Sequence, residues 1–296
     1  MTDIAVGSSS SRTPTGPWNL RSVGLCATVL VMPRNDIEII YQDSDLVVIN
    51  KPAGISTTAD RTGEPDLLPL LQKQLGADAG LRLVHRLDKY ASGVMLLAKN
   101  LATQSKLSSL FEKRQVKKTY LALVAGSVRR RGGTIDVPLS HSRKNPRVMR
   151  TNRKRGKPAV TRWNLLADFG AMALLAAEPV TGRTHQIRVH LKSIGMPLAI
   201  DRLYGSDRSI MLSDFKQDYR PKKDKAETPL IDRLTLCAYQ IEIPPDLGKP
   251  TTFIARLDKK FAAVIKALTK YNPNSSDAFI NPAHLTTILA AQPLAL

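Results

Sequence analysis

Residues 83–99 have the sequence LVHRLDKYASGVMLLAK, in which a polar stretch runs directly into an apolar one. His85 to Ser92 form the polar stretch, Gly93 follows it, and Val94 to Ala98 are apolar without interruption. An apolar run of this length next to a turn predicts a buried strand. Asp88 is therefore expected in a loop just ahead of a core strand.

Strand patterns surround this segment, and helical patterns are fewer. A β-hairpin is predicted from residues 37–41 and 46–50, joined by the acidic turn Asp43–Asp45. Further strands are predicted later in the chain, at residues 117–124, 159–166, 171–180, 233–243 and 251–257. Helices are predicted at residues 67–75, after an Asn100 cap, after a Thr184 cap and at 259–269. The Thr184 helix should carry Ile187, Leu191 and Ile194 on one stripe. Strands in runs predict an α+β fold on a mixed, largely antiparallel sheet with flanking helices.

One domain is expected over residues 37–270. Residues 1–36 contain Ser, Pro and Gly clusters and predict a flexible N-terminal extension, and residues 271–296 predict a C-terminal tail. No apolar run is long enough to span a membrane, so no membrane partner is expected. The chain has only 2 Cys residues, too few for a disulfide framework or a Cys-rich zinc site, which favours a reducing, cytoplasmic location.

The charge balance is strongly positive. Lys and Arg number 44 against 25 acidic residues, a formal net charge of +19, which indicates a polyanionic partner such as nucleic acid. Residues 143–157, here called the finger, read RKNPRVMRTNRKRGK and hold eight cations and no acid. A solvated, disordered run is one interpretation. The position of the finger between two strands favours an RNA clamp, with phosphate contacts from four finger cations, Arg150, Arg153, Lys154 and Arg155.

Several familiar sites are not supported by the sequence. It lacks the Gly-x-Gly-x-x-Gly and Walker patterns of nucleotide cofactors, and His185 and His190 lack the Glu of the metalloprotease pattern. We therefore expect no cofactor and no metal. Asp88 lies near Arg86 and Lys89, cations that favour an ionised carboxylate suited to a nucleophile or a base. The alternative is a structural loop Asp paired with Arg86.

Several segments together resemble the RluA-type pseudouridine synthase family. They occur in the family's order over residues 37–260, and they are Asn50–Gly54, His85–Gly93, Lys118–Val124 and Thr181–His190, with Asp201 and Tyr204–Gly205 downstream. Two positions depart from the family pattern. Ala91 stands where the family usually has Thr, and Ile200 stands where it usually has Gly.

The resemblance implies a pseudouridine synthase fold with a central basic cleft, and a cofactor-free isomerase that converts uridine to pseudouridine in ribosomal or transfer RNA. It implies that Asp88 is the nucleophile, attacking either the sugar or the base. Arg188 matches the arginine that pairs with this carboxylate. Tyr120 matches the tyrosine that flanks the base and assists proton abstraction.

The resemblance also implies residues that contact RNA. Arg86 matches the arginine that enters the stack when the target base is flipped out. Ile187 is expected to pack on the uracil ring or, equally well, in the core. Arg183 and His185 belong to the same matched segment and are assigned to RNA binding. No obligate protein partner is implied, and a monomer is expected.

Two other classes of function are weighed against this one. A non-catalytic RNA-binding or chaperone protein on the same scaffold predicts loss of Asp88, Arg188 or Tyr120, and all three are present. A nuclease would need clustered carboxylates for metal, and Asp43, Asp45 and Asp88 form no evident ligand set.

Overall fold

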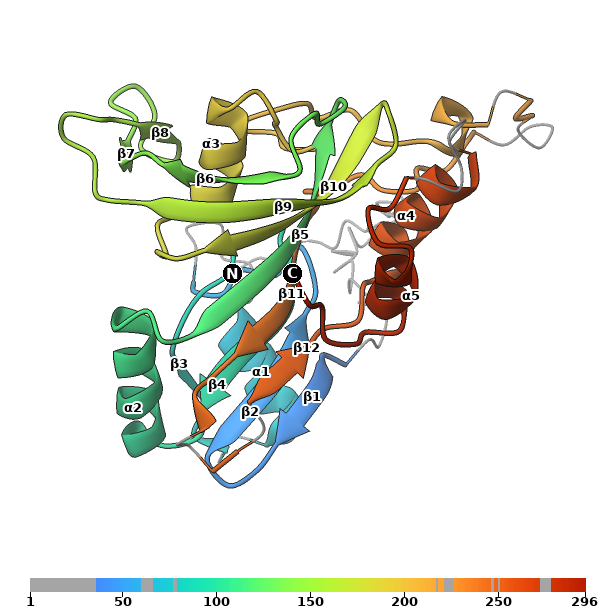
Figure 1. Cartoon of the computed structure of the whole chain (residues 1–296). Helices are drawn as coiled ribbons and strands as arrows, with labels where there is room; N and C mark the ends of the chain where they lie inside the picture. The colour runs from blue at the N-terminus through green and yellow to red at the C-terminus, as the bar shows by residue number, and fades with distance from the viewer. Residues whose placement is uncertain are drawn as a thin grey trace, which may run out of the picture. The chain divides into compact units, whose positions relative to one another are not determined.

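The strands assemble into a sheet whose order differs from their order in the chain (Figure 1). They are β1 (Glu38–Gln42), β2 (Leu46–Lys51), β3 (Arg82–Leu83), β4 (Ser92–Ala98), β5 (Lys117–Ala125), β6 (Gly132–Asp136), β7 (Leu139–His141), β8 (Met149–Thr151), β9 (Val160–Asp168), β10 (Met172–Pro179), β11 (Leu236–Glu242) and β12 (Thr252–Ile254). Among the described residues, ten strands form the main sheet in the order β1-β2-β4-β11-β5-β10-β9-β6, with β12 beside β11 and β3 beside β4. A second sheet pairs β7 with β8.

The computed structural model describes residues 36–59, 66–76, 79–216, 218–220, 226–245, 248–249, 251–271 and 278–296. These residues all belong to one unit, Asp36–Leu296. The expected N-terminal extension, residues 1–36, lies outside the described residues except for Asp36. Within the described ranges, no helix is both long and apolar enough to cross a membrane.

The predicted α+β fold with a mixed, largely antiparallel sheet is confirmed. Among the described strands, β4 and β11 are the only parallel neighbours in the main sheet. Gly93 lies at this junction with φ +120°, and a Cβ on it would be 2.1 Å from the carbonyl oxygen of Ala238. Only glycine allows the two backbones to come this close. Because Gly93 has no side chain, β4 can pair with β11 and so connect β1 and β2 to the strands from β5 to β6.

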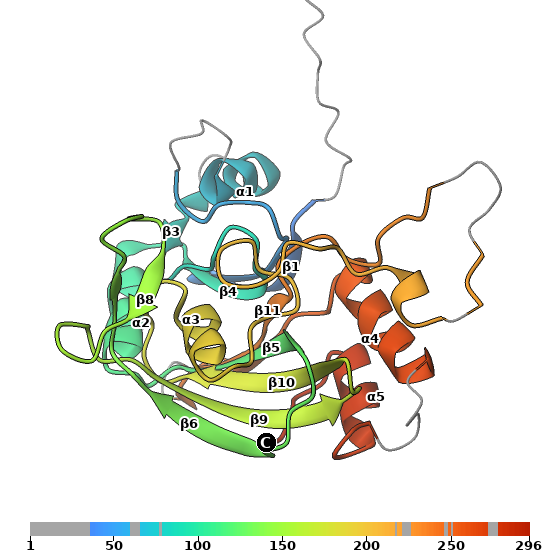
Figure 2. The ribbon, with the colours of Figure 1, turned by 90° about the horizontal axis from the view of Figure 1, so that it is seen from above.

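The helices pack on different parts of this sheet. They are α1 (Leu67–Leu75), α2 (Leu101–Glu112), α3 (Gln186–Ser193), α4 (Lys259–Tyr271) and α5 (Ala283–Leu289). Helices α1 and α2 share a core with β2 and β4. Alternating residues of β5 and β10 pack on α3 from one face of the sheet and on α4 and α5 from the other. Figure 2 shows α3 inside the curve made by β10, β9 and β6.

Several local predictions are confirmed. The 37–41 and 46–50 hairpin is the antiparallel pair β1–β2, residues 67–75 are α1, and the Val94–Ala98 run lies within the fully buried β4. The side chain of Asn100 caps α2 by accepting the backbone N–H of Thr103 at 2.8 Å. The short strands β3, β6, β7 and β8 were not predicted, because two to five residues are too few to show a period.

The expected C-terminal tail is wrong for its described part, residues 278–296. Phe279, Ile288 and Leu294 are buried in the core that contains α4. The hydroxyl of Tyr239 on β11 donates to the carbonyls of Thr287 and Gln292, at 3.1 and 2.7 Å. The segment therefore completes one face of the sheet. Its weak apolar pattern did not predict this, because its burial depends on strands distant in the chain.

The predicted start of α3 is also wrong by one residue. The N-cap is His185, in the left-handed region with φ +52°, and its side chain makes no cap hydrogen bond. Gln186 fixes the preceding turn instead, since its Oε1 accepts the Arg183 N–H at 3.0 Å and the Thr181 hydroxyl at 2.7 Å. At the other end, Ile194 is the C-cap and is 43% exposed, not buried on the helix stripe.

Candidate active site

The backbone on both sides of Asp88 is clamped by the loop that follows β2. Thr57 accepts the Leu87 N–H at 3.2 Å and donates its hydroxyl to the Leu87 carbonyl at 2.9 Å. The Gly54 N–H donates to the Lys89 carbonyl at 2.8 Å. The residues before and after Asp88 are thus held by hydrogen bonds, and the carboxylate is presented from a fixed loop.

A buried lysine supports the same loop. Lys51 is fully buried, and its ammonium donates to the carbonyls of Pro52, Ile55 and Lys89 at 2.9, 2.8 and 3.2 Å. Burial lowers the pKa of Lys51 to about 7, although the negative charge of Asp88 opposes this shift. Lys51 therefore ties the β2 loop to the Asp88 loop through its hydrogen bonds.

Arg188 on α3 connects two carboxylates that lie far apart in the chain. Its Nη1 donates to Asp88 Oδ2 at 2.9 Å, while Nε and Nη2 donate to the two oxygens of Asp201, each at 2.8 Å. The guanidinium also lies over the Tyr204 ring, 4.9 Å from its centroid. Burial alone lowers the pKa of Arg188, but the hydrogen bonds and charges of Asp201 and Asp88 outweigh it and raise that pKa above its ordinary value. The cation is permanent, and its bidentate pairing with Asp201 fixes the direction of Nη1.

Helix α3 is held against β9 by polar side chains. Gln186 donates to the Val160 carbonyl and the Thr161 hydroxyl at 2.9 and 3.0 Å. His190 is fully buried between the Thr161 hydroxyl and the Val137 carbonyl, each 2.9 Å from a ring nitrogen. His190 therefore has a packing role. Within the described ranges, no group of three or more His, Cys, Asp or Glu residues is placed to hold a metal ion.

Asp88 opens into a pocket of about 510 Å³, which is within the usual range of about 300–1,000 Å³ for small-molecule sites. Tyr120, which lies on β5, lines the wall together with Leu87, Ala91 and Ile187. Burial raises the pKa of Tyr120 well above its ordinary value, and the negative charge of Asp88 acts in the same direction. The phenol is therefore protonated at neutral pH and offers a hydrogen-bond donor to the pocket.

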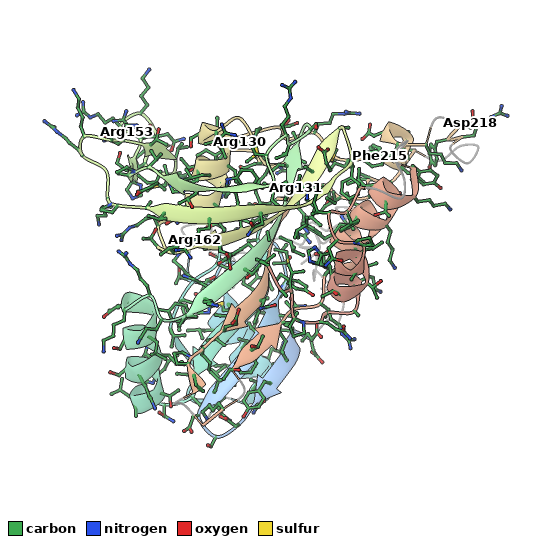
Figure 3. The ribbon with its side chains drawn as sticks, viewed as in Figure 1. Arg130, Arg131, Arg153, Arg162, Phe215 and Asp218 are labelled. Atoms are coloured by element: carbon green, nitrogen blue, oxygen red, sulfur yellow. The ribbon has the colours of Figure 1, made fainter. Side chains whose placement is uncertain are left out.

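The finger belongs to a hydrogen-bonded hairpin and contributes its second strand, β8. Residues 139–141 and 149–151 pair as β7 and β8, with Arg150 opposite Ser140. A second turn follows, in which the side chain of Asn152 accepts the N–H groups of Lys154 and Arg155 at 3.2 and 3.1 Å. All eight finger cations are exposed, and within the described residues none has an acidic partner. Figure 3 shows Arg153 on this hairpin, Arg130 and Arg131 in the bend just before β6, and Arg162 on β9.

Comparison with known proteins identifies one family of enzymes. The sequence matches the model of the RNA pseudouridylate synthase family over residues 45–193. The chain belongs to this family. Its members convert uridine to pseudouridine in RNA, so the chain is an RNA pseudouridine synthase and not a member of the non-catalytic class weighed above.

Known pseudouridine synthases resemble the chain over most of its length. The uncharacterised RNA pseudouridine synthase YhcT of Bacillus subtilis is 34% identical over 227 residues, covering 75% of this chain and 73% of the relative. Ribosomal large subunit pseudouridine synthase D of Borreliella burgdorferi is 33% identical over 245 residues, covering 79% and 69%. The solved structure of human RNA pseudouridylate synthase domain containing 4 has a TM-score of 0.60 and 29% identity, covering 78% of this chain and 92% of that one.

The structure of this pseudouridine synthase brings most of the predicted site residues together. Seven of them line the one pocket, namely Asp88, Tyr120, Arg188, Arg86, Ile187, Arg183 and His185. The four finger cations are on the hairpin outside the pocket lining. The departures from the family pattern are both buried, Ala91 at 1% exposure in the pocket wall and Ile200 at 1% in the core on the other face of the sheet.

Sequence reasoning missed several residues of the site. Arg114 and Lys118 add positive charge to the pocket lining, and Asp201 fixes Arg188. His85 stacks on Phe111 at 4.5 Å between ring centroids, which closes another part of the wall. Lys118 is two residues before Tyr120 on the same predicted strand, so strand alternation was a usable signal for its side chain. His85 lies in the segment already singled out around Asp88. The position of Arg114, in a turn after α2, had no such signal.

Proposed function

We propose that this protein converts a uridine of ribosomal RNA to pseudouridine with Asp88 as the nucleophile. One observation carries the proposal: the Asp88 carboxylate faces a pocket of nucleoside size while Arg188 holds one of its oxygens at 2.9 Å. Relatives named as ribosomal large subunit synthases favour ribosomal over transfer RNA. We further propose that the protein acts as a monomer in the cytoplasm.

The isomerisation breaks the bond between N1 of uracil and C1′ of the ribose and forms a bond from C5 to C1′. The proton on C5 is lost and N1 gains one, so no atoms are gained or lost. A carboxylate nucleophile at C1′ or at the uracil ring divides this change into smaller steps. The hydrogen bond from Arg188 would keep the Asp88 carboxylate oriented when RNA excludes water from the pocket.

Tyr120 is assigned to the uracil ring. Its raised pKa is opposite to the shift that a general base requires, since an efficient base has a pKa near the working pH. We therefore propose that the phenol first acts as a hydrogen-bond donor that orients the detached base. A role for Tyr120 in removing the C5 proton requires a change in its surroundings when RNA binds.

RNA binding is assigned to the pocket rim and the finger. A uridine in a helix must be extruded to reach Asp88, which costs a few kcal/mol of stacking and pairing. Arg86 is exposed at the rim and can fill the vacated place in the stack. The exposed finger cations can contact phosphates, which would supply affinity and register without selecting the base.

The test measures release of tritium from RNA labelled at C5 of uridine. Large-subunit ribosomal RNA and transfer RNA from cells lacking the gene serve as substrates for wild type and Asp88→Asn. We expect wild type to act on the ribosomal RNA and Asp88→Asn to release no tritium while retaining RNA binding. The matched control is Asp207→Asn, an exposed carboxylate outside the pocket lining, which should be fully active.

Each assignment can fail separately in this experiment. Turnover by Asp88→Asn would end the assignment of the nucleophile. Release from transfer RNA alone would overturn the choice of ribosomal RNA and leave the reaction intact.

A further inference from the structure

The hydroxyl of Tyr204 lies between the finger and the active site, and the proposed function gives it no role. The backbone N–H of Met149, on β8 of the finger, donates to this hydroxyl oxygen at 2.7 Å. The same oxygen is 2.8 Å from Nδ1 of His185. Met149 and Tyr204 are both buried, at 7% and 5% exposure, so these contacts are shielded from water.

The hydrogen-bond partners of the Tyr204 hydroxyl indicate the tautomer of His185. The Tyr204 oxygen already accepts from Met149, and burial raises the pKa of Tyr204, so the hydroxyl keeps its hydrogen and donates it. Within the described residues Nδ1 of His185 is the only acceptor within hydrogen-bond distance of this hydroxyl, so the arrangement that satisfies both groups has Nδ1 accepting the Tyr204 hydrogen. Burial lowers the pKa of His185 below its ordinary value, with the neighbouring charges acting in both directions, so the ring is neutral with its single hydrogen on Nε2.

The protonated Nε2 of His185 faces Asp88. It lies 4.0 Å from Oδ2, the same oxygen to which Arg188 donates at 2.9 Å. Within the described residues, Oδ1 of Asp88 has no hydrogen-bond partner. Arg188 therefore hydrogen-bonds Oδ2, His185 Nε2 faces the same oxygen from beyond hydrogen-bond distance, and Oδ1 is left without a partner among the described residues. The left-handed backbone of His185, with φ +52°, aims the ring this way, a strained conformation for a residue other than glycine.

We propose that Tyr204 and His185 are positioning residues that make Oδ1 the attacking oxygen of Asp88. This inference rests on the proposed role of Asp88 as nucleophile. If Oδ1 attacks C1′, the Oδ1–C1′ bond forms as the C1′–N1 bond breaks and its electron pair leaves on uracil. If Oδ1 attacks C6 of the ring, the Oδ1–C6 bond forms as the C5–C6 π pair moves onto the ring. In both cases Oδ2 becomes the carbonyl oxygen of the resulting ester. When the ester breaks, the bonding electron pair returns to the carboxylate. The guanidinium of Arg188 and the N–H of His185 then stabilise the charge that returns to Oδ2.

The finger is the fixed end of this chain of contacts. The Met149 N–H orients the Tyr204 hydroxyl, the hydroxyl sets the tautomer of His185, and His185 directs its N–H toward Asp88. The hairpin that carries the finger cations thus also supports the geometry of the chemical step. Loss of the Tyr204 hydroxyl should affect turnover and leave the phosphate contacts unchanged.

The experiment compares Tyr204→Phe with Tyr239→Phe. Tyr239→Phe is a matched control because its buried hydroxyl also has two partners, both backbone carbonyls, outside the pocket lining. We expect Tyr204→Phe to lower kcat about tenfold, because the hydrogen bond between the Tyr204 hydroxyl and His185 is lost and a tenfold change is within the typical net strength of one hydrogen bond. The KM for RNA should change little, because His185 then positions Asp88 less well for the chemical step while the RNA contacts remain. Tyr239→Phe should have the kcat of wild type.

A spectroscopic measurement separates positioning from a loss of structure. The ¹⁵N chemical shifts of His185 should show a protonated Nε2 in wild type and a mixture of tautomers in Tyr204→Phe. An unchanged kcat or an unchanged tautomer in Tyr204→Phe would overturn the inference. Turnover by Asp88→Asn would instead remove the proposed function on which the inference rests.

A second pair of variants applies if Tyr204→Phe does not fold. His185→Gln keeps an N–H near the position of Nε2, whereas His185→Asn is too short to present one there. We expect His185→Gln to retain more of the wild-type kcat than His185→Asn. Equal kcat values for the two variants would contradict the role given to the Nε2 hydrogen.

Discussion

Replacing Arg188 with Met removes the hydrogen bonds that its guanidinium donates to Asp201 and Asp88. Asp201 is 1% exposed, so its charge would stay in the core with only the N–H groups of Leu203 and Tyr204 as donors among the described residues. Removing one partner of a buried ion pair costs about 3–5 kcal/mol. We expect the free energy of unfolding of Arg188→Met to fall by about that amount.

The assay is equilibrium unfolding in urea at neutral pH, followed by circular dichroism, with the denaturant slopes of all variants compared. Arg86→Met is the control, because Arg86 lines the same pocket but is exposed and has no acidic partner within the described residues. Its free energy of unfolding should stay within about 0.5 kcal/mol of wild type. Asp201→Asn keeps an oxygen acceptor, and its combination with Arg188→Met should show a coupling energy of about 1–3 kcal/mol.

Two results would refute this reasoning. A loss of less than about 1 kcal/mol for Arg188→Met would place the pair among solvent-screened surface ion pairs. Strict additivity of Arg188→Met and Asp201→Asn would show that the two side chains do not depend on each other. In either case the fixed direction of Nη1 toward Asp88 would lose its physical basis.

Three further predictions concern acid stability, the sheet junction and RNA affinity. Burial lowers the pKa of His85 from 6.5 to about 3, so between these values the unfolded chain binds a proton that the folded chain does not. Wild type should therefore lose up to about 1.4 kcal/mol per pH unit as pH falls through this window, and His85→Gln should lack that component in acid unfolding curves. Gly93→Ala should lower the free energy of unfolding by about 3 kcal/mol or more because of its clash with β11, whereas Gly182→Ala, which meets no neighbouring atom within 4 Å, should change it by less than about 1 kcal/mol in the same urea assay. Replacing the four finger cations with Ala should flatten the plot of log affinity against log salt by about 3 units if all four contact phosphates, with a much smaller change in turnover at saturating RNA; parallel salt plots would show that these charges only face solvent.

The local sequence pattern was sufficient to predict the elements whose residues pack against neighbours that are close in the chain. The β1–β2 hairpin, α1 and β4 follow from alternation, apolar runs and turn residues that lie within a few positions of one another. Local pattern failed where a distant partner supplies the burial. Helix α5 and Leu294 have weak patterns of their own, and they are ordered against Tyr239 and Gln240 on β11.

The site divides in a similar way. Asp88, Tyr120 and Arg188 were found from segments that resemble the family's motifs, and the structure brings all three to one pocket. The N-cap of α3 was misplaced because a Gln side chain that bonds backward to Thr181 replaces the ordinary Thr cap. The partner of Arg188 was only half predicted. Asp201 was noted as a match to the family pattern but was given no role, so its two hydrogen bonds with Arg188 were not predicted.

The sequence by itself determined the chemical inventory of this protein: a strongly basic chain, a loop carboxylate ahead of a buried strand, and the motif residues of an RNA-modifying enzyme. Only the tertiary structure decided which oxygen of Asp88 is held, because Arg188 and His185 reach it from another element, 100 and 97 residues further along the chain. It also decided that Met149 of the finger contacts Tyr204 beneath the pocket. Residue identity supplies charge and hydrogen-bonding capacity, whereas direction and distance arise only when α3, β8 and the Asp88 loop pack together, since a hydrogen bond depends steeply on both.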